Sequence, residues 1–169
     1  EYTQLDPWVE LAQILEKGCF DALFLADVVG VYDAYKGGPE TSIIQGMQIP
    51  VNDPAMLIPA MAHATENLGF AFTSSVLQSH PFSFARQMST LDHLTNGRVA
   101  WNIVTSYLPN AGANFGLGGL PSHDDRYDLA EEYIDVTYKL WEGSWEDDAV
   151  LRDKERSVYA DPAKIHKIN

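Results

Sequence analysis

The chain is poor in basic residues and carries a single cysteine. Its 169 residues include 11 lysines and arginines against 24 aspartates and glutamates, which gives a formal net charge of −13 at pH 7. A surface this acidic repels phosphate backbones and anionic lipid, so we expect neither nucleic acid nor a membrane as a partner. The lone Cys19 excludes an internal disulfide framework and fits a reducing cytoplasm, where we expect the protein to reside. From its place between a helix stop and a strand, we expect Cys19 to be a small buried residue and not a nucleophile.

Long apolar runs, targeting signals and metal motifs are also missing. No apolar run approaches the roughly 20 residues that cross a bilayer, and the first ten residues lack the basic and apolar parts of a signal peptide. The five histidines do not have the spacing of a metal site, and there is no GxSxG nucleophile motif. Because 46% of the residues are hydrophobic, residues 1–169 can still form one domain with a buried core.

Helical and strand-like patterns alternate along the chain. Expected helices span 7–17, 53–66, 80–94 and 125–141, and expected strands span 20–26, 68–76 and 98–105. Asp53 followed by Pro54 is typical of a capped helix start, and Asn96-Gly97 is the expected stop of the helix over 80–94. The first strand is a nearly continuous apolar run, typical of a strand buried on both faces. Residues 27–52 show no period, and residues 147–169 are charged and mixed.

Helices between successive strands force the strands to run parallel, with the helices outside the sheet. A doubly wound sheet and a (β/α)8 barrel both satisfy this alternation. Three strands complete neither architecture, and a whole barrel takes about 250 residues, so we expect the chain to be part of a larger protein.

Each expected strand ends in small polar or acidic residues: Asp27 after the first, Thr73 to Ser75 in the second, and Ser106 after the third. Parallel α/β folds bind ligands at this edge of the sheet, so we expect Asp27, Thr73 and Ser106 to surround one cavity. The alternative is that these residues only cap strands or begin turns. Asn102 lies inside the third strand and must find a partner there.

A segment that begins at Pro109 and carries four glycines (Gly112, Gly116, Gly118 and Gly119) separates the third strand from the last helix. Its spacing matches neither phosphate-binding fingerprint, so a flexible loop is the stronger interpretation. His123 and Tyr127 stand four residues apart at the entrance of the helix. They could hydrogen-bond a polar ligand, or they could serve only capping and packing.

Several motifs together resemble one enzyme family. They are ALFLADVVGVYD (22–33), QIPVNDP (48–54), TLDHLTNGRVAWNIVTS (90–106), NFG (114–116), HDDRYDLAEEY (123–133) and KLWEGSWEDDAV (139–150). The chain is similar in these segments to the flavin-dependent two-component monooxygenases of the bacterial-luciferase-like superfamily. The nearest group oxidises long-chain alkanes, nitrilotriacetate and dibenzothiophene sulfone, with the alkane branch nearest.

The resemblance implies a luciferase-like (β/α)8 TIM barrel of which this chain supplies about strands 2–4 with their helices. It also implies reduced FMN delivered by a separate NAD(P)H-dependent flavin reductase, and O2 as co-substrate. A C4a-(hydro)peroxyflavin would then insert one oxygen atom into a small organic substrate of the alkane, organosulfur or chelator type. We expect the full-length protein to be a homo-oligomer.

The family's FMN contacts match five positions of this chain: Asp27, Thr73, Ser106, His123 and Tyr127. Asn102 is a further candidate for cofactor binding. A later serine-rich phosphate contact of the family has no counterpart up to Asn169, so we expect the FMN site within these residues to be incomplete.

The catalytic candidates are Tyr32, Gln48 and Tyr107. Tyr32 and Gln48 match polar residues on the substrate side of the alkane branch, which carries a histidine at the position of Tyr107. A tyrosine can donate a hydrogen bond to a flavin peroxide oxygen, but with a pKa near 10 it shuttles protons poorly near neutrality. This departure counts against alkane hydroxylation and fits an organosulfur compound or a chelator.

Two other functions stay open at this point. The first is a non-catalytic flavin-binding or structural barrel subunit with the same fold. The second is a deazaflavin-dependent dehydrogenase, whose motifs differ from the NGRVAWNIVTS type. Retention of all five matched FMN positions favours the monooxygenase.

Overall fold

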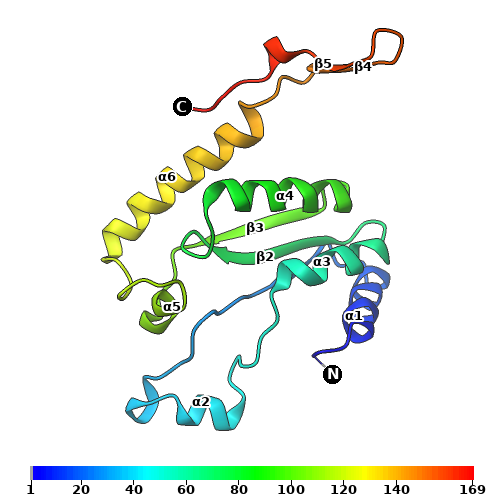
Figure 1. The fold of residues 1–169 in the computed structure, drawn as a ribbon. Helices are drawn as coiled ribbons and strands as arrows, with labels where there is room; N and C mark the ends of the chain where they lie inside the picture. Colours follow the sequence, from blue (N-terminus) through cyan, green and yellow to red (C-terminus); the bar gives the residue numbers. More distant parts are fainter. Residues whose placement is uncertain (1) are drawn as a thin grey trace.

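A computed structural model describes residues 2–169 and is built around a parallel sheet (Figure 1). The strands are β1 (Ala22–Leu25), β2 (Gly69–Ser75) and β3 (Val99–Val104), hydrogen-bonded in the order β1-β2-β3. The main helices are α1 (Asp6–Lys17), α3 (Pro54–His63), α4 (Pro81–Thr95) and α6 (His123–Glu142). Their alternation with the strands agrees with the predicted order of elements.

Short elements complete the described chain. They are the 3-10 turn η1 (Tyr35–Gly37), α2 (Glu40–Gln45), α5 (Pro109–Asn114), the antiparallel strands β4 (Val150–Asp153) and β5 (Val158–Ala160), and the 3-10 turn η2 (Pro162–Lys164). The sequence patterns predicted none of these elements. Each is short enough that no helical or strand period develops within it.

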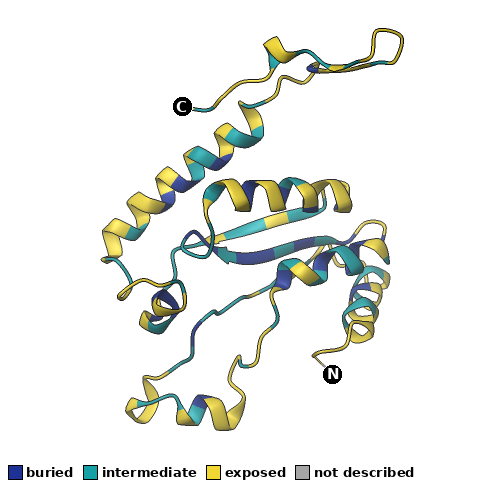
Figure 2. Cartoon of the chain, viewed as in Figure 1, coloured by how far each residue is buried: buried dark blue, intermediate teal, exposed yellow. Residues whose placement is uncertain are grey.

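The two faces of the sheet have different roles. Phe70 and Phe72 of β2 are almost fully buried among residues of α3 and α4, such as Ile58 and Leu91. Because side chains alternate along a strand, Thr73 and Ser75 point to the opposite face. The helices therefore cover one face of the sheet (Figure 2), and the polar ends of the strands belong to the other.

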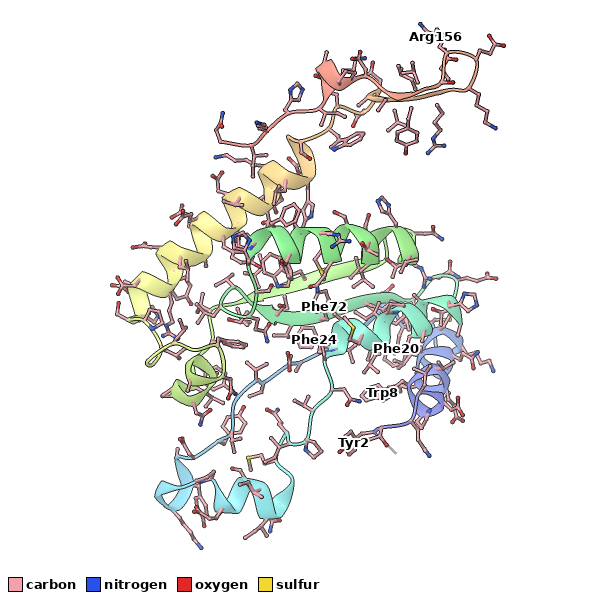
Figure 3. All side chains as sticks on the ribbon, in the orientation of Figure 1. Tyr2, Trp8, Phe20, Phe24, Phe72 and Arg156 are labelled. Carbon is pink, nitrogen blue, oxygen red and sulfur yellow. The ribbon has the colours of Figure 1, made fainter. Side chains whose placement is uncertain are left out.

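The prediction that the first strand is buried on both faces is wrong for β1. Its burial alternates between exposed and intermediate, and the side chain of Phe24 is 57% exposed. β1 is an edge strand paired only with β2 among the described strands. Phe24, labelled with Phe72 in Figure 3, is the register partner of Ala71, so its side chain lies on the face of the sheet opposite to that of the buried Phe72. Some of the apolar side chains of β1 therefore lie on a face of the sheet that residues 2–169 leave uncovered.

Local signals set the ends of the helices. Asp53 accepts a hydrogen bond from the backbone N–H of Ala55 at 3.0 Å, and Pro54 begins α3 as predicted. Asn96 adopts a left-handed conformation with φ 54° and ends α4, also as predicted. Cys19 likewise has a positive φ and is exposed, so the small buried role expected for it is wrong.

Arg98 joins the elements at the amino-terminal edge of the sheet, opposite the carboxyl ends of the strands. Its guanidinium donates to the backbone oxygens of Ala62 (2.7 Å), Leu68 (2.8 Å) and Thr95 (3.0 Å), and to both the backbone and the hydroxyl oxygens of Thr65. Carbonyls just past a helix have no partner within the helix. One half-buried cation therefore satisfies the end of α3 and fixes it to the start of β2 and β3.

We predict that Arg98→Met destabilises the protein by about 2–4 kcal/mol, because several partly buried carbonyls lose a charged donor. Chemical denaturation of the full-length protein measures this change. The matched control is Arg156→Met at the tip of the β4–β5 hairpin (Figure 3), whose guanidinium contacts only the nearby Asp153 among the described residues. Equal losses for the two variants would contradict the role assigned to Arg98.

Candidate functional site

A cavity of about 220 Å³ lies at the carboxyl ends of the parallel strands. Its lining includes five of the predicted site residues: Asp27, Thr73, Asn102, Ser106 and Tyr107. They come from three separate regions of the chain and meet because parallel strands end at one edge of a sheet. The structure thus brings together the polar strand ends around one cavity, as the sequence predicted.

Neighbouring strands hold the polar groups of this cavity in place. Thr73 and Asn102 are register partners on β2 and β3, and Nδ2 of Asn102 donates to Oγ1 of Thr73 at 3.0 Å. Ser106 has φ 63°, and its hydroxyl donates to Oγ of Ser75 at 2.8 Å. Asn102 has therefore found the partner that an amide in a strand requires. Its Oδ1 and the hydroxyl proton of Thr73 have no partner among residues 2–169.

Asp27 is held by Gln78, a residue that the sequence analysis missed. Nε2 of Gln78 donates to Oδ2 of Asp27 at 3.2 Å, while Oε1 accepts from the N–H of Ser75 and the hydroxyl of Ser74, both at 2.7 Å. Because a backbone N–H can only donate, the orientation of the Gln78 amide is fixed. Burial raises the pKa of Asp27 above its ordinary value of 3.8, and the hydrogen bond from Gln78 partly opposes this shift.

A second, larger cavity of about 810 Å³ adjoins the first. The two share Asp27, Val29, Thr73 and Gln78 in their linings, and the larger one continues between α3 and α4. Asp27 and Gln78 therefore form part of the wall between the two cavities. A polar ligand that reached either cavity would meet the Asp27 carboxylate.

Three side chains form a hydrogen-bonded chain beside the cavity. The hydroxyl of Tyr32 contacts Oε1 of Gln48 at 3.1 Å and also contacts the hydroxyl of Tyr107. Because an amide oxygen can only accept, the hydroxyl of Tyr32 donates to Gln48, and the hydroxyl of Tyr107 donates to that of Tyr32. This donation, with burial, raises the pKa of Tyr107 to about 12. Tyr107 thus stays protonated near neutrality.

His123 and Tyr127 lie at the start of α6, one turn apart, and neither lines either cavity. Their rings are 5.0 Å apart between centroids, the side chain of His123 is 74% exposed, and its Nδ1 lies 2.8 Å from a carboxylate oxygen of Asp124. The residue that connects this turn to the cavity is Arg126, which donates to the backbone oxygen of Ser106. Within residues 2–169, the structure does not bring His123 and Tyr127 to Asp27.

Sequence reasoning missed Gln78 and Arg126 for a common reason. Gln78 comes just after β2, and Arg126 lies between the two predicted ligands of α6, so both positions were close to motifs already identified. Their partners are 51 and 20 residues away in the sequence, and a local sequence pattern cannot predict contacts over such separations. Position next to a predicted site residue was the only available signal.

Two negative findings apply to residues 2–169. No group of three or more histidine, cysteine, aspartate or glutamate side chains is arranged there to hold a metal ion. In the same part of the chain, no helix combines the length and the apolar character needed to span a bilayer.

The strand order and the cavity at the strand ends define a section of a parallel α/β fold. A family model described as luciferase-like monooxygenase matches residues 1–162. The chain therefore belongs to the luciferase-like monooxygenase family, and the expected barrel type is confirmed, with the chain covering part of it.

Similar proteins include several named monooxygenases. The chain is 62% identical over 168 residues to long-chain alkane monooxygenase of Geobacillus thermodenitrificans and 54% identical over 168 residues to dimethyl-sulfide monooxygenase of Hyphomicrobium sulfonivorans. These matches cover 99% of this chain, but only 38% and 35% of the two relatives. The chain thus spans little more than a third of the length of either relative.

Solved structures agree closely with the fold. The crystal structure of a long-chain alkane monooxygenase superposes with a TM-score of 0.94 over 98% of this chain and 38% of the other. A riboflavin lyase crystallised with modified FMN and riboflavin is 45% identical, with a TM-score of 0.89 over 98% of this chain and 37% of the other. The arrangement of β1, β2 and β3 is therefore shared with proteins of this family.

We predict that Asp27→Asn stabilises the flavin-free protein at pH 7. The folded-state pKa of Asp27 lies above its unfolded value, so ionised Asp27 costs the fold free energy. This cost is absent below the unfolded pKa and grows as the pH rises through the folded one. Asparagine keeps an acceptor for Gln78 without the charge.

Thermal unfolding of the full-length protein across pH tests this prediction. The midpoint of Asp27→Asn should exceed that of the unmodified protein near pH 7 and converge with it below about pH 3. Asp128→Asn, on the exposed surface of α6, is the control and should change the midpoint little at any pH. A difference that grew toward acid pH would reverse the sign and contradict the assignment.

Proposed function

We propose that this chain is part of an FMNH2- and O2-dependent monooxygenase that inserts one oxygen atom into a small organic substrate. The observation that carries the proposal is the convergence of Asp27, Thr73, Asn102 and Ser106 on one cavity at the strand ends. Membership of a family whose similar members are named monooxygenases supports it. The alternative of a non-catalytic flavin-binding subunit has no observation in its favour.

The donor set of the cavity fits an isoalloxazine ring. Such a ring needs apolar walls together with acceptors for its N–H group and donors for its carbonyl oxygens. Phe24, Val104 and Leu108 supply apolar walls, and Asp27 supplies an acceptor. The free Thr73 hydroxyl proton supplies a donor. At about 220 Å³ the cavity is smaller than the roughly 300–1,000 Å³ of typical ligand pockets, which supports a site completed by further parts of a full-length barrel.

In this proposal the residues at the strand ends hold the cofactor. Asp27, Thr73, Asn102 and Ser106 would bind and orient FMN, and His123 and Tyr127 stay proposed contacts at the entrance of α6. Reduced FMN, when bound, supplies the activation of O2 and the transfer of one oxygen atom. The protein contributes position and the exclusion of water, because water and acid divert reduced flavin chemistry into unproductive oxidation.

Tyr107, Tyr32 and Gln48 would form the polar side of the substrate pocket. With its pKa raised to about 12, Tyr107 can hold a proton and donate a hydrogen bond but cannot accept a proton near neutrality. Catalysis here would therefore rely on orientation by Tyr107 and not on a proton shuttle at this position. This property favours an organosulfur or chelator substrate over an alkane.

The remaining parts of the proposal concern partners. Reduced FMN would come from a separate NAD(P)H-dependent flavin reductase, a supply that suits the cytoplasm. We propose that the full-length protein is a homo-oligomer. Similarity to proteins named for the oxidation of long-chain alkanes and of dimethyl sulfide supports a small molecule as the substrate.

A reconstituted reaction tests the proposed function. The full-length protein is mixed with FMN, a flavin reductase, NADH and isotopically labelled O2, and offered an alkane, a dialkyl sulfide or an aminopolycarboxylate chelator. We expect one labelled oxygen atom in the product of at least one substrate class. Flavin binding without product from any class would support the non-catalytic alternative, and failure to bind FMN would refute both.

We predict that Tyr107→His adds a pH dependence to the oxygenation rate. Imidazole has an ordinary pKa of about 6.5, so this variant should change rate between about pH 5.5 and 7.5. The unmodified protein and Tyr107→Phe should show no transition in that range from this position. Rate profiles of the three proteins, recorded at saturating FMN, make the comparison, and identical profiles would show that residue 107 takes no part in proton transfer.

A further inference from the structure

Two segments far apart in the sequence meet above the end of β2. One is residues 28–33, which follow β1, and the other is residues 106–114, which follow β3 and include α5. Because β2 lies between β1 and β3, these segments must cross the end of β2 to touch. The cavity of about 220 Å³ has walls from both segments: Val29 and Gly30 from one, and Leu108 and Ala111 from the other.

Asn110 joins the two segments through a two-point contact. Its Oδ1 accepts from the N–H of Val31 at 3.0 Å, and its Nδ2 donates to the backbone oxygen of Val31 at 2.7 Å. The side-chain amide thus pairs with the backbone as a neighbouring strand would. Since the N–H of Val31 can only donate and its C=O can only accept, the orientation of the amide is fixed. Nδ2 also reaches a carboxylate oxygen of Asp33 at 3.3 Å.

Asn114 adds a second contact one turn further along α5. Its Nδ2 donates to the backbone oxygen of Val29 at 2.7 Å. Residues four apart on a helix lie on one face and are separated by about 6 Å along its axis. Asn110 and Asn114 therefore hold Val31 and Val29, the residues on either side of the bend at Gly30. We call these two asparagines the asparagine clasp.

Gly30 provides independent support for the clasp. A Cβ built on Gly30 would overlap Oδ1 of Asn110 and approach a methyl carbon of Leu108 to 3.1 Å. Residue 30 is also buried. The absence of a side chain at this position is therefore what lets Asn110 reach Val31.

The clasp acts on residues that belong to the candidate site. Val31 directly precedes Tyr32, whose hydroxyl meets that of Tyr107 on the other segment. At the other end of the clasped stretch, Val29 lies two residues after Asp27. Fixing Val29 and Val31 therefore fixes the backbone that carries both Asp27 and Tyr32.

We propose that Asn110, assisted by Asn114, is a positioning residue of the flavin and substrate site, a role that rests on the function proposed above. It holds residues 28–33 against α5, which closes the cavity over β2 and keeps Tyr32 in contact with Tyr107. It touches neither cofactor nor substrate and acts through the segment that it holds.

Hydrogen–deuterium exchange and FMN titration of the full-length protein test this role. In Asn110→Ala, amides of residues 28–36 should exchange about tenfold faster without flavin, because two hydrogen bonds to Val31 are lost. Amides of β2 and β3 should keep their rates. The Kd for FMN, followed by flavin fluorescence, should rise about tenfold when the backbone that follows Asp27 is no longer held.

Matched variants separate positioning from general loss of structure. Asn67→Ala, an exposed asparagine before the opposite end of β2, should change neither measurement. Asn114→Ala loses one contact and should give a smaller effect in the same segment. Gly30→Ala should weaken FMN binding in the presence of Asn110 and much less in an Asn110→Ala background, since the overlapping atom is then absent.

The outcomes distinguish the clasp from the function on which it rests. Unchanged exchange at residues 28–36 in Asn110→Ala would overturn the clasp, and so would equal acceleration across the whole chain. Faster local exchange with unchanged FMN affinity would overturn its role in the site. If the unmodified protein did not bind FMN, the proposed function would fail, and the exchange data would still decide whether the clasp holds the segment.

Discussion

The parallel pairing of β2 with β3, and of β2 with β1, is the constraint on which the candidate site depends. It sets Thr73 opposite Asn102 and brings Asp27 and Ser106 to the same edge of the sheet. Along β2, alternation then assigns Phe70 and Phe72 to the helix-covered face and Thr73 and Ser75 to the cavity, where Phe24 and Val104 of the neighbouring strands add apolar walls. Side chains of β2 that pack in the core alternate with side chains that face the cavity. The core around Phe70 can therefore be densely packed without restricting the site.

Several polar side chains near the cavity are held in place by hydrogen bonds within the protein. Gln78 satisfies the end of β2 and presents its amide nitrogen to Asp27, and Asn102 donates to Thr73. A carboxylate in such a place has its pKa raised because it has lost water. Burial of the ionised carboxylate destabilises the fold, but it also fixes the position of a hydrogen-bond acceptor. This is the usual relation between a strained or desolvated group and a binding role.

Sequence patterns predicted the three strands, the main helices, the cap at Asp53 and the stop at Asn96, because each depends on residues close in the chain. They also predicted which strand ends would meet, since parallel topology leaves little choice. They failed for β1, whose apolar run indicated burial that this part of the chain does not provide. They could not predict Gln78 or Asn110, whose partners lie 51 and 79 residues away. Contacts at that distance depend on the assembled sheet.

The connection between β1 and α3 shows how one sheet could serve different substrates. Residues 27–52 contain the short α2, and several of their apolar side chains are exposed, including Ile43, Ile44 and Met47. Their attachment to the body relies on specific contacts such as those of Asn110, and not on a buried core. A segment held in this way can change in sequence and shape while the strand ends stay fixed. If the strand ends bind the cofactor as proposed, residues 34–52 of this connection could vary for different substrates while Asn110 and Asn114 keep residues 28–33 and Asp27 in place.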